Sequence, residues 1–505
     1  MRAGLWPLLF SLVPFPIPSV AAQAGQTLLG IPSLNGFNLV STTSPLLYML
    51  PPSAPSITIS FALCSTNLPL PRVFVSNSTM PGPTVGPNGA PETYEVTFEQ
   101  GVGAWTGEAP TGASIGVYVG QGALNSSSWQ FEIAVQEGET PAHTIDTNLP
   151  TLADTSSTRA IVFSTTFQNI TVEPTSYPNY TLPALDPYDS FSFPTYLPPS
   201  SLLLLPTPAQ LSALPYFRSS CALRAMQSSL NYNATQTNLV RSPETGWQTE
   251  FVVPGGLTPQ TNYTVWVTQG PKISGPIYMQ TKSEAFDDTC TFVHALPYCP
   301  LVSYPIPLVN TTQATTPDVY NSTNLPIEIS SNITGFLANF SINLGTFACG
   351  RDVYSPLHDC TDCMDAYRTW ACYVSFPRCA EPATNSTSTS IPSPPLQPQV
   401  PFALKPIATS DPPRALGFPN ATTPYTEVLP CIETCNTVHR NCPPFLGWQC
   451  PDPDQNANDS YALGVLDSDD GHHEGEGILG GRLRAGMGDV MGVVDVWGNV
   501  WCNGA

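Results

Sequence analysis

Two stretches decide the fold: FACGRDVYSPLHDCTDCMDAYRTWACYVSFPRC, residues 347–379, and LPCIETCNTVHRNCPPFLGWQC, residues 429–450. In the first, residues at helical spacing predict one shared helix face: Cys363, Tyr367, Trp370 and Ala371. Cysteines at this spacing predict a small helical module that is held together by disulfides.

The second stretch repeats the pattern on a shorter helix. The predicted stripe contains Cys431, Cys435, Val438 and Cys442. Pro430 suits the first helical position, and the pair 443–444 is expected to end the helix because proline cannot continue it. Each disulfide stabilises a fold by roughly 2–4 kcal/mol, mainly by restricting the unfolded chain.

The chain has 14 cysteines, an even number that an oxidising compartment would pair. Four lie outside the C-terminal third: Cys64, Cys221, Cys290 and Cys299. We predict that the other ten form disulfides: Cys349, Cys360, Cys363, Cys372, Cys379, Cys431, Cys435, Cys442, Cys450 and Cys502. The alternative is a zinc site at Cys360-Thr-Asp-Cys363, but only His358 and His439 lie nearby, so no metal is expected.

Two biased segments interrupt this C-terminal domain, which we place at 349–505. Residues 382–424 contain eleven prolines and no cysteine, which predicts a flexible insertion or, alternatively, an interdomain linker. Residues 464–492 form an atypical Gly-rich insertion with an acidic and histidine-containing run, which we interpret as solvated rather than metal-binding.

Residues 25–285 predict a β-rich, sandwich-like region. Period-two alternation occurs in runs of strand length at 56–62, 94–98, 114–120, 129–135, 160–166 and 263–269. The turn before Tyr263 is typical of fibronectin-type sandwiches, so its hydroxyl is expected to bond nearby backbone. One helix is predicted around 209–230, interrupted at Pro215.

Residues 286–348 are a predicted connecting region that ends in an apolar stretch at 333–350. A spanning helix needs about 20 mostly apolar residues. This stretch contains Asn339, Ser341 and Asn343, so we expect a buried element there, with a weak membrane span as the alternative.

The N-terminus predicts export. A basic start, an apolar run and small residues at 22 and 24 are typical of a signal peptide at 1–24, and an uncleaved anchor is the alternative. Sequons, which mark surface loops of exported proteins, begin at Asn77, Asn125, Asn169, Asn179, Asn233, Asn262, Asn310, Asn321, Asn332, Asn339, Asn385, Asn420 and Asn458.

Composition argues against two function classes. A net charge of −21 disfavours nucleic acid, which is itself a polyanion. The Gly-x-Ser-x-Gly match at 112–116 is followed by a strand-like run, not by the helix that a nucleophile elbow needs. The GxGxxG match at 475–480 lacks a flanking strand and helix. We therefore predict no catalytic residues, no cofactor and no enzyme activity.

The cysteine module resembles the C-terminal part of the fungal Mid family, the stretch-activated calcium-channel component. The matching stretches are 347–379, 424–451 and the terminal WGNVWCNGA, 497–505. The Gly-rich run at 475–492 has no expected counterpart in that family. The resemblance implies a small Frizzled-like cysteine-rich domain, similar to the extracellular auxiliary subunit of the vertebrate sodium-leak channel.

The resemblance also implies a partner and a place. Mid-type proteins associate with a large four-repeat pore subunit at the plasma membrane and promote calcium influx under stretch or stress, including stress of the endoplasmic reticulum. We expect an accessory subunit on the extracellular face, held at the membrane through that partner or a weak apolar segment. Aromatic and basic residues expected to be exposed are candidate contacts: Tyr367, Arg368, Trp370, Phe376 and Arg378. A ligand-binding receptor ectodomain and a cell-wall glycoprotein remain the rival interpretations.

Overall fold

The computed structural model is described over only part of the chain. The described residues are 27–40, 46–65, 71–77, 93–118, 128–169, 199–207, 218–227, 234–240, 246–308, 319–347, 354–355, 357–381, 404–451, 457, 460–462, 493–494 and 500–504. The chain divides into two compact units that interleave in sequence: 1–149 with 198–230 and 264–276, and 150–197 with 231–263 and 277–505.

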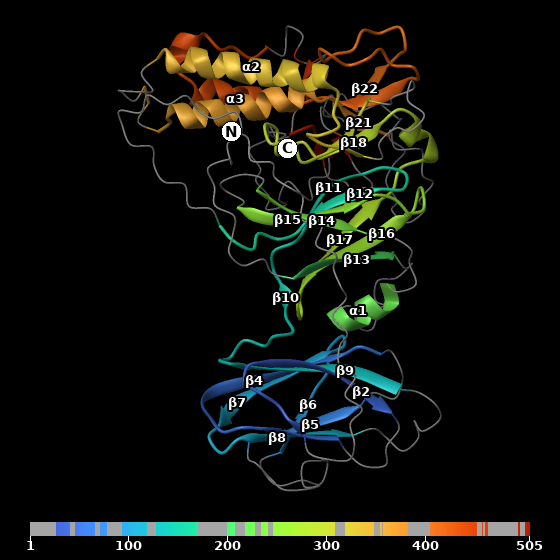
Figure 1. The fold of residues 1–505 in the computed structure, drawn as a ribbon, viewed down its shortest axis with the longest axis vertical. Helices are drawn as coiled ribbons and strands as arrows, with labels where there is room; N and C mark the ends of the chain where they lie inside the picture. The colour runs from blue at the N-terminus through green and yellow to red at the C-terminus, as the bar shows by residue number, and fades with distance from the viewer. Residues whose placement is uncertain are drawn as a thin grey trace, which may run out of the picture. The chain divides into compact units, whose positions relative to one another are not determined.

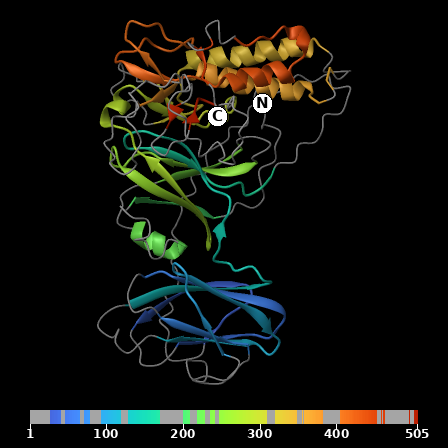
Figure 2. The same cartoon turned by 180° about the vertical axis from the view of Figure 1, so that it is seen from behind.

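The first unit is built on two packed sheets (Figures 1 and 2). One sheet has the order β1-β3-β8-β5-β6 and the other the order β2-β9-β4-β7. The first sheet contains β1 (Thr27–Leu28), β3 (Leu46–Leu50), β5 (Arg72–Ser76), β6 (Thr93–Val96) and β8 (Ala113–Tyr118). The second contains β2 (Ser33–Val40), β4 (Ser53–Leu63), β7 (Val102–Ala109) and β9 (Ser128–Glu137).

The sandwich core follows from the alternation in the sequence. On β4 and β9, every second side chain points into the core, as in Ile57, Ile59 and Phe61 on β4. Tyr48 and Ile115 face them from the other sheet. The predicted strands at 56–62 and 129–135 are therefore confirmed, and those at 94–98 and 114–120 are confirmed over 94–96 and 114–118. The β-rich, multidomain and disulfide-rich fold class is confirmed as well.

A further sheet has the strand order β10-β17-β16-β13. Its strands are β10 (Ile145–Asp146), β13 (Ser200–Pro206), β16 (Asn262–Gln269) and β17 (Lys272–Gln280). Helix α1 (Ser220–Gln227) packs against β13 and β4, and the disulfide Cys64–Cys221 ties it to the end of β4. The predicted helix at 209–230 is confirmed over these residues, while 209–217 and 228–230 lie outside the described part.

The second unit begins with the sheet β11-β12-β15-β14. Its strands are β11 (Thr151–Thr155), β12 (Ala160–Phe163), β14 (Thr235–Val240) and β15 (Trp247–Val253). At the start of β16, the Thr258 amide donates a 2.9 Å hydrogen bond to the buried hydroxyl of Tyr263. This is the backbone bond that the sequence predicted for that tyrosine.

Next comes a three-stranded sheet, β19-β18-β20, followed by a long helix. The strands are β18 (Thr291–Val293), β19 (Tyr304–Ile306) and β20 (Val319–Tyr320), preceded by the 3-10 turn η3 (Glu284–Asp288). Helix α2 (Ile327–Gly345) buries Ile329, Ile333, Leu337 and Leu344 at helical spacing. It is the buried element expected before the cysteines, and no helix in the described ranges is long and apolar enough to cross a bilayer.

The two cysteine stretches form helices beside α2, as Figure 1 shows for α2 and α3. These are α3 (Cys360–Ser375) and α4 (Ile432–Asn441), with the turn η5 (Pro444–Leu446) after α4. The remaining strands are β21 (Arg378–Ala380), β22 (Leu404–Ile407), β23 (Tyr425–Val428), β24 (Val493–Val494) and β25 (Val500–Trp501). Cys431 caps α4, so Pro430 lies one residue before the cap rather than at the first helical position as predicted.

The proline-rich segment contains ordered structure in its second half. Strand β22 pairs with β23, and the loop after it buries Ala415 and Phe418 in the helical core. Arg414 holds this loop in place through a 2.8 Å ion pair with the buried Glu427. The expectation that 382–424 buries no core is therefore wrong for 404–424, because Phe and Ala at a few positions suffice to anchor a loop.

Several predictions concern residues outside the described ranges. These are the signal peptide at 1–24, the segments 382–403 and 464–492, and Cys349. The same holds for six of the predicted glycosylation sites: Asn125, Asn179, Asn233, Asn310, Asn385 and Asn458.

Candidate functional site

Disulfides fix α3, α4 and the β-strands around them into one module, and α2 joins it by packing against α3. The disulfide Cys363–Cys442 joins α3 to the end of α4 and so connects the two cysteine stretches. The other module disulfides are Cys290–Cys379, Cys299–Cys372, Cys431–Cys502 and Cys435–Cys450. Cys360 is also disulfide-bonded. Five cross-links of this kind restrict the relative motion of α3, α4 and the neighbouring strands.

Helix α3 begins at a capping box that directs its orientation. The Asp359 carboxylate accepts hydrogen bonds from the amides of Thr361 and Asp362, and the Asp362 carboxylate accepts one from the Asp359 amide. The hydroxyl of Tyr354 contacts the carbonyl oxygens of Asp359 and Asn441. These contacts place the start of α3 beside the end of α4, where Cys363 meets Cys442.

Aromatic rings gather where α2 and α4 flank α3. Tyr367 stacks on Phe340 of α2 with ring centroids 3.6 Å apart. Trp370 and Trp448 meet edge to face at 4.7 Å, and each also contacts Tyr367. Burial among these groups raises the pKa of the Tyr367 phenol. Phe340 is buried in the core, whereas Tyr367, Trp370 and Trp448 are partly buried, so this aromatic cluster is both core and surface.

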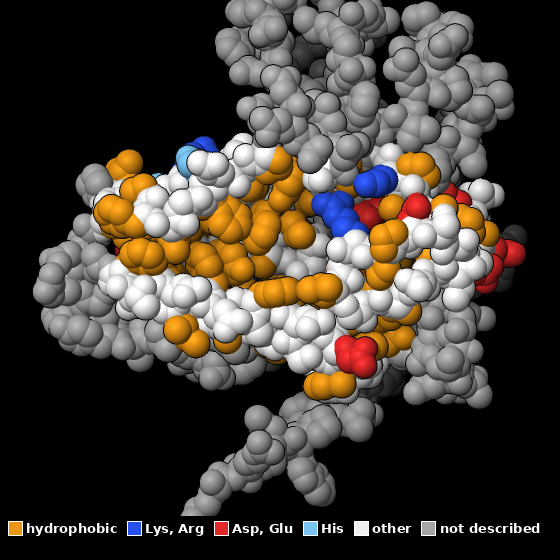
Figure 3. Space-filling model, turned by 90° about the horizontal axis from the view of Figure 1, so that it is seen from above, with side chains coloured by type: hydrophobic (Ala, Val, Ile, Leu, Met, Phe, Trp, Pro, Cys, Tyr) orange, Lys and Arg blue, Asp and Glu red, His pale blue; other side chains and the backbone are white. Residues whose placement is uncertain are grey.

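This cluster continues to an open face of the module. Phe336 lies one helical turn before Phe340 on α2, and Phe347 stacks with Phe445 of η5 beyond the end of α2. Figure 3 shows hydrophobic side chains gathered in a hollow on the face that bears the helices. We call the surface formed by Phe336, Phe340, Tyr367, Trp370, Phe445 and Trp448 the aromatic groove.

The five contact candidates from the sequence do not share one surface. Tyr367 and Trp370 lie in the aromatic groove. Phe376 is 0% exposed, and its carbonyl accepts a 2.9 Å hydrogen bond from Tyr304. The expectation that Phe376 is exposed is wrong, because it fills the core beneath α3.

The two arginines among those candidates are also drawn inward. Arg368 is 5% exposed and pairs with Asp365, whose pKa is raised because burial outweighs the attraction of the arginine. Arg378 donates to Asp154 at 2.7 Å and lies over the ring of Tyr304. The expectation of exposed arginines is wrong: Arg378 pairs with the buried Asp154, and Arg368 is itself buried while it reaches Asp365 near the surface.

Arg378 belongs to a buried charge cluster that the sequence did not reveal. Asp154 on β11 bonds Arg378 on β21 and, at 2.7 Å, Lys282 after β17. Burial alone would raise the pKa of Asp154, but the two adjacent cations lower it below its usual value. Burial lowers the pKa of Lys282, and Asp154 opposes that effect. This charge cluster links the sheet that contains β11 to the strand that follows α3.

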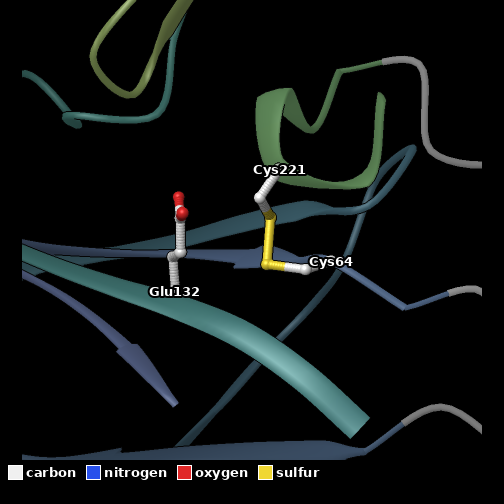
Figure 4. A group of neighbouring side chains, drawn as sticks. All are labelled: Cys64, Glu132 and Cys221. Atoms are coloured by element: carbon white, nitrogen blue, oxygen red, sulfur yellow. A yellow bond between two sulfur atoms is a disulfide. The ribbon is translucent and has the colours of Figure 1, made fainter. Parts of the chain in front are cut away.

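In the described part of the chain, two groups combine a pair of cysteines with a glutamate. Cys64, Glu132 and Cys221 lie together (Figure 4), but the two sulfurs form a disulfide and cannot act as thiolate ligands. The same holds for Cys431 and Cys502 beside Glu433.

A serine–histidine–glutamate arrangement occurs in the sandwich. Ser60 Oγ lies 2.9 Å from His143 Nδ1, and His143 Nε2 lies 3.5 Å from Glu132. Ser60 is 1% exposed and also accepts a hydrogen bond from the His143 amide, so its hydroxyl meets no substrate. Ser114 of the Gly-x-Ser-x-Gly match lies inside β8, which lacks the strand–turn–helix of a nucleophile elbow.

Seven predicted glycosylation sites fall within the described ranges. Four are exposed: Asn169, Asn262, Asn339 and Asn420. Three are half-buried: Asn77, Asn321 and Asn332. Asn332 packs its amide near Gly417 of the loop that Arg414 holds in place. Attachment of glycans at these positions stays a prediction.

Comparison with known proteins gives one consistent result. A family described as "Stretch-activated Ca2+-permeable channel component" matches residues 56–476. The stretch-activated cation channel MID1 of Cryptococcus neoformans var. grubii is 30% identical over 96% of this chain and 85% of its own length.

Two shorter matches agree with it. The MID1 protein of Saccharomyces cerevisiae is 30% identical over 41% of this chain and 36% of its own length. The stretch-activated cation channel yam8 of Schizosaccharomyces pombe is 25% identical over 46% of this chain and 45% of its own length.

Proposed function

Because this chain belongs to the family of stretch-activated Ca2+-permeable channel components, we propose that it is an accessory subunit that regulates a calcium channel. In this role it binds a large four-repeat pore subunit on the extracellular face of the plasma membrane. It promotes calcium influx when the membrane is stretched or the cell is stressed. The chain's own residues perform no catalysis in this proposal.

One observation carries the proposal: the disulfide-linked helices present an open aromatic face. A module that is already rigid loses little conformational entropy when it binds, so more of the contact energy appears as affinity. Large aromatic side chains also dominate the energetics of protein interfaces. Trp370, Trp448 and Tyr367 provide such a surface on a stiff support.

Helix α2 bears on how the chain is attached to the membrane. In the described part of the chain, α2 is the long apolar helix, and it is not apolar enough to span a bilayer. Its apolar stripe instead packs into the core of the module. The proposal therefore places the membrane attachment in the partner and not in α2.

Affinity purification tests the proposal. A tagged copy of the chain is expressed in a fungal cell and recovered from detergent-solubilised plasma membranes under mild conditions. We expect a four-repeat channel polypeptide to co-purify, and calcium uptake under hypo-osmotic shock to fall when the chain is deleted.

Two results would count against this function. Recovery with wall glucan alone would favour the cell-wall glycoprotein, and recovery of free monomer with unchanged calcium uptake would favour a receptor ectodomain. A parallel purification of an unrelated tagged secretory glycoprotein controls for carry-over of channel polypeptides.

A further inference from the structure

We propose that Asn339 of α2 carries an N-linked glycan whose first N-acetylglucosamine lies against Gly335 and Phe336, and that Asn332 of the same helix carries none. The inference goes beyond the proposed function, because it concerns a covalent modification of the chain itself and needs no channel partner. It separates two sequons of one helix by the surroundings that the fold gives to each.

The sequon at Asn339 begins on the exposed side of α2 and ends on its buried side. Asn339 is exposed, whereas Ser341, which completes the sequon, is 3% exposed. The enzyme that modifies a sequon has to recognise both residues. The glycan is therefore attached before α2 packs against the core, and in the folded module the modified side chain lies at the surface, where a bulky group is tolerated.

The covalent step uses a lipid-pyrophosphate-linked oligosaccharide of the secretory pathway as the donor. Asn339 Nδ2 forms a bond with C1 of the first N-acetylglucosamine, and the bond from C1 to the pyrophosphate oxygen breaks. The lipid pyrophosphate leaves with the bonding electron pair, and the amide nitrogen gives up one proton to water. The product is a neutral glycosyl amide that still has one N–H.

The turn of α2 before Asn339 has room for the first sugar. A helical side chain leans toward the N-terminus of its helix and covers the turn before its own Cα, which for Asn339 contains Gly335 and Phe336. Phe336 is 42% exposed, and a Cβ on Gly335 would have no atom within 4 Å. Glycine is less favourable than alanine inside a helix, and packing does not require it here. The open space over Gly335, beside the ring of Phe336, fits a sugar ring.

The chemistry of N-acetylglucosamine suits this surface. One face of the sugar presents C–H groups, while its hydroxyls lie around the edge of the ring. With the C–H face on Phe336, the hydroxyls stay in water and no polar group is buried without a partner. The contact removes from water an aromatic ring that is otherwise exposed.

Asn332 lies two helical turns before Asn339 on the same stripe, but it faces protein. A Cβ on Gly417 would lie 2.9 Å from Asn332 Nδ2, the atom that would carry the sugar. Gly417 is held there because its neighbours Ala415 and Phe418 are buried in the helical core. A glycan on Asn332 would exclude this loop, so the folded chain has an unmodified Asn332.

Glycopeptide mass spectrometry of the full chain, purified from a fungal host with its disulfides intact, tests the assignment of the two sequons. We expect a glycan on Asn339 and an unmodified Asn332. An unmodified Asn339, or a glycan on Asn332, would overturn the proposal.

A double-mutant cycle tests the contact with Phe336. Asn339→Gln removes the glycan and is expected to lower the Tm by about 2–4 °C, but by less than about 1 °C in a chain that also carries Phe336→Ser. The matched control is Ile342→Ser, because Ile342 is 55% exposed and lies on the turn after Asn339, which the sugar does not cover. In that background Asn339→Gln should lower the Tm as much as it does in the wild type.

Enzymatic trimming shows which sugar makes the contact. An endoglycosidase that leaves one N-acetylglucosamine on each asparagine should leave the Tm difference between wild type and Asn339→Gln unchanged. Loss of that difference on trimming, or an equal effect of Asn339→Gln with and without Phe336, would overturn the contact. None of these measurements involves a channel, so their failure is distinguishable from failure of the proposed function.

Discussion

The Tyr263 hydroxyl shows how much one polar atom contributes in the core of a β-sheet protein. Its ring is buried at the start of β16, and its oxygen accepts the Thr258 amide at 2.9 Å. The hydrogen bond closes the turn that leads into the strand. Without the hydroxyl, the amide of the exposed residue Thr258 would lose this acceptor.

We therefore predict that Tyr263→Phe lowers the free energy of unfolding by about 1 kcal/mol, the net contribution of a typical hydrogen bond. Urea denaturation of the purified chain, followed by tryptophan fluorescence, measures this change. Tyr94→Phe is the matched control, because Tyr94 is 49% exposed. A loss that is equally large in both variants would contradict the role of the hydrogen bond.

At this scale, local patterns in the sequence were informative only where the partner is also local. Tyr263 and Thr258 are five residues apart, so a turn pattern predicts the bond between them. Arg378 and Asp154 are 224 residues apart, and no local pattern could show that the arginine faces inward. The burial of Phe376 could not be predicted for the same reason, because its partner Tyr304 comes from a distant strand.

At the scale of elements, the Asp154 charge cluster joins β11 to β21. One carboxylate serves two cations, Lys282 and Arg378, at 2.7 Å each. In the disulfide Cys290–Cys379, Cys379 is the residue next to Arg378, and Cys290 directly precedes β18, so the bond links the start of β18 to the same strand. Strand β21 is thus held in place both by a disulfide and by an ion pair.

Asp154→Asn is expected to destabilise the second unit by roughly 3 kcal/mol at pH 7, because two partly buried cations lose their carboxylate. Since the folded pKa of Asp154 is lowered, its contribution is present above the unfolded value near 4 and is lost as the pH falls through the folded value. The difference between wild type and variant should therefore shrink below about pH 4.

Denaturation of both proteins between pH 3 and pH 7 measures this difference. Glu95→Gln, which breaks the exposed pair with Arg72, is the control and should change stability little at any pH. A stability gap between wild type and Asp154→Asn that stays constant down to pH 3 would contradict the ion-pair explanation.

Periodicity predicted elements better than composition did. The alternation at 56–62 and 129–135 and the helical spacing from Cys363 onward predicted β4, β9 and α3. The proline-rich composition of 382–424 suggested that no core forms there, yet Phe418 packs against the ring of Phe376. Composition describes a segment as a whole, so it cannot show that one side chain, such as Phe418, packs into the core.

For the whole molecule, the disulfide Cys363–Cys442 bridges the two halves of the module. Its residues are 79 apart, and closing a loop of that length in the unfolded chain stabilises the fold by about 4–5 kcal/mol in the chain-entropy model. The Cys435–Cys450 loop spans 15 residues and contributes about 3 kcal/mol in the same model. The longer bridge also holds α4 against α3, which sets the width of the aromatic groove.

We predict that the double variant Cys363→Ala with Cys442→Ala loses more stability than Cys435→Ala with Cys450→Ala. Removing both partners avoids a free thiol that could pair wrongly. Under the proposed function, calcium uptake after hypo-osmotic shock should fall in cells that carry the first variant.

Non-reducing thermal denaturation ranks the two variants, and radiolabelled calcium uptake reports the function. Secreted protein is quantified for each strain, so that lost uptake is not confused with lost expression. Full uptake with a normally secreted Cys363→Ala, Cys442→Ala protein would show that the bridge is dispensable.

The order in which the cysteines pair has a consequence for biosynthesis. Cys64 and Cys221 precede the other twelve cysteines of the sequence, and they bond each other, so the sandwich can oxidise before those later thiols are made. The later pairs overlap in sequence. Cys431 is synthesised before Cys435 and Cys450, but its partner Cys502 is synthesised after both of them. Oxidation in order of appearance would give wrong pairs there, so maturation of the helical module should depend on an enzyme that reshuffles disulfides, whereas the sandwich should not.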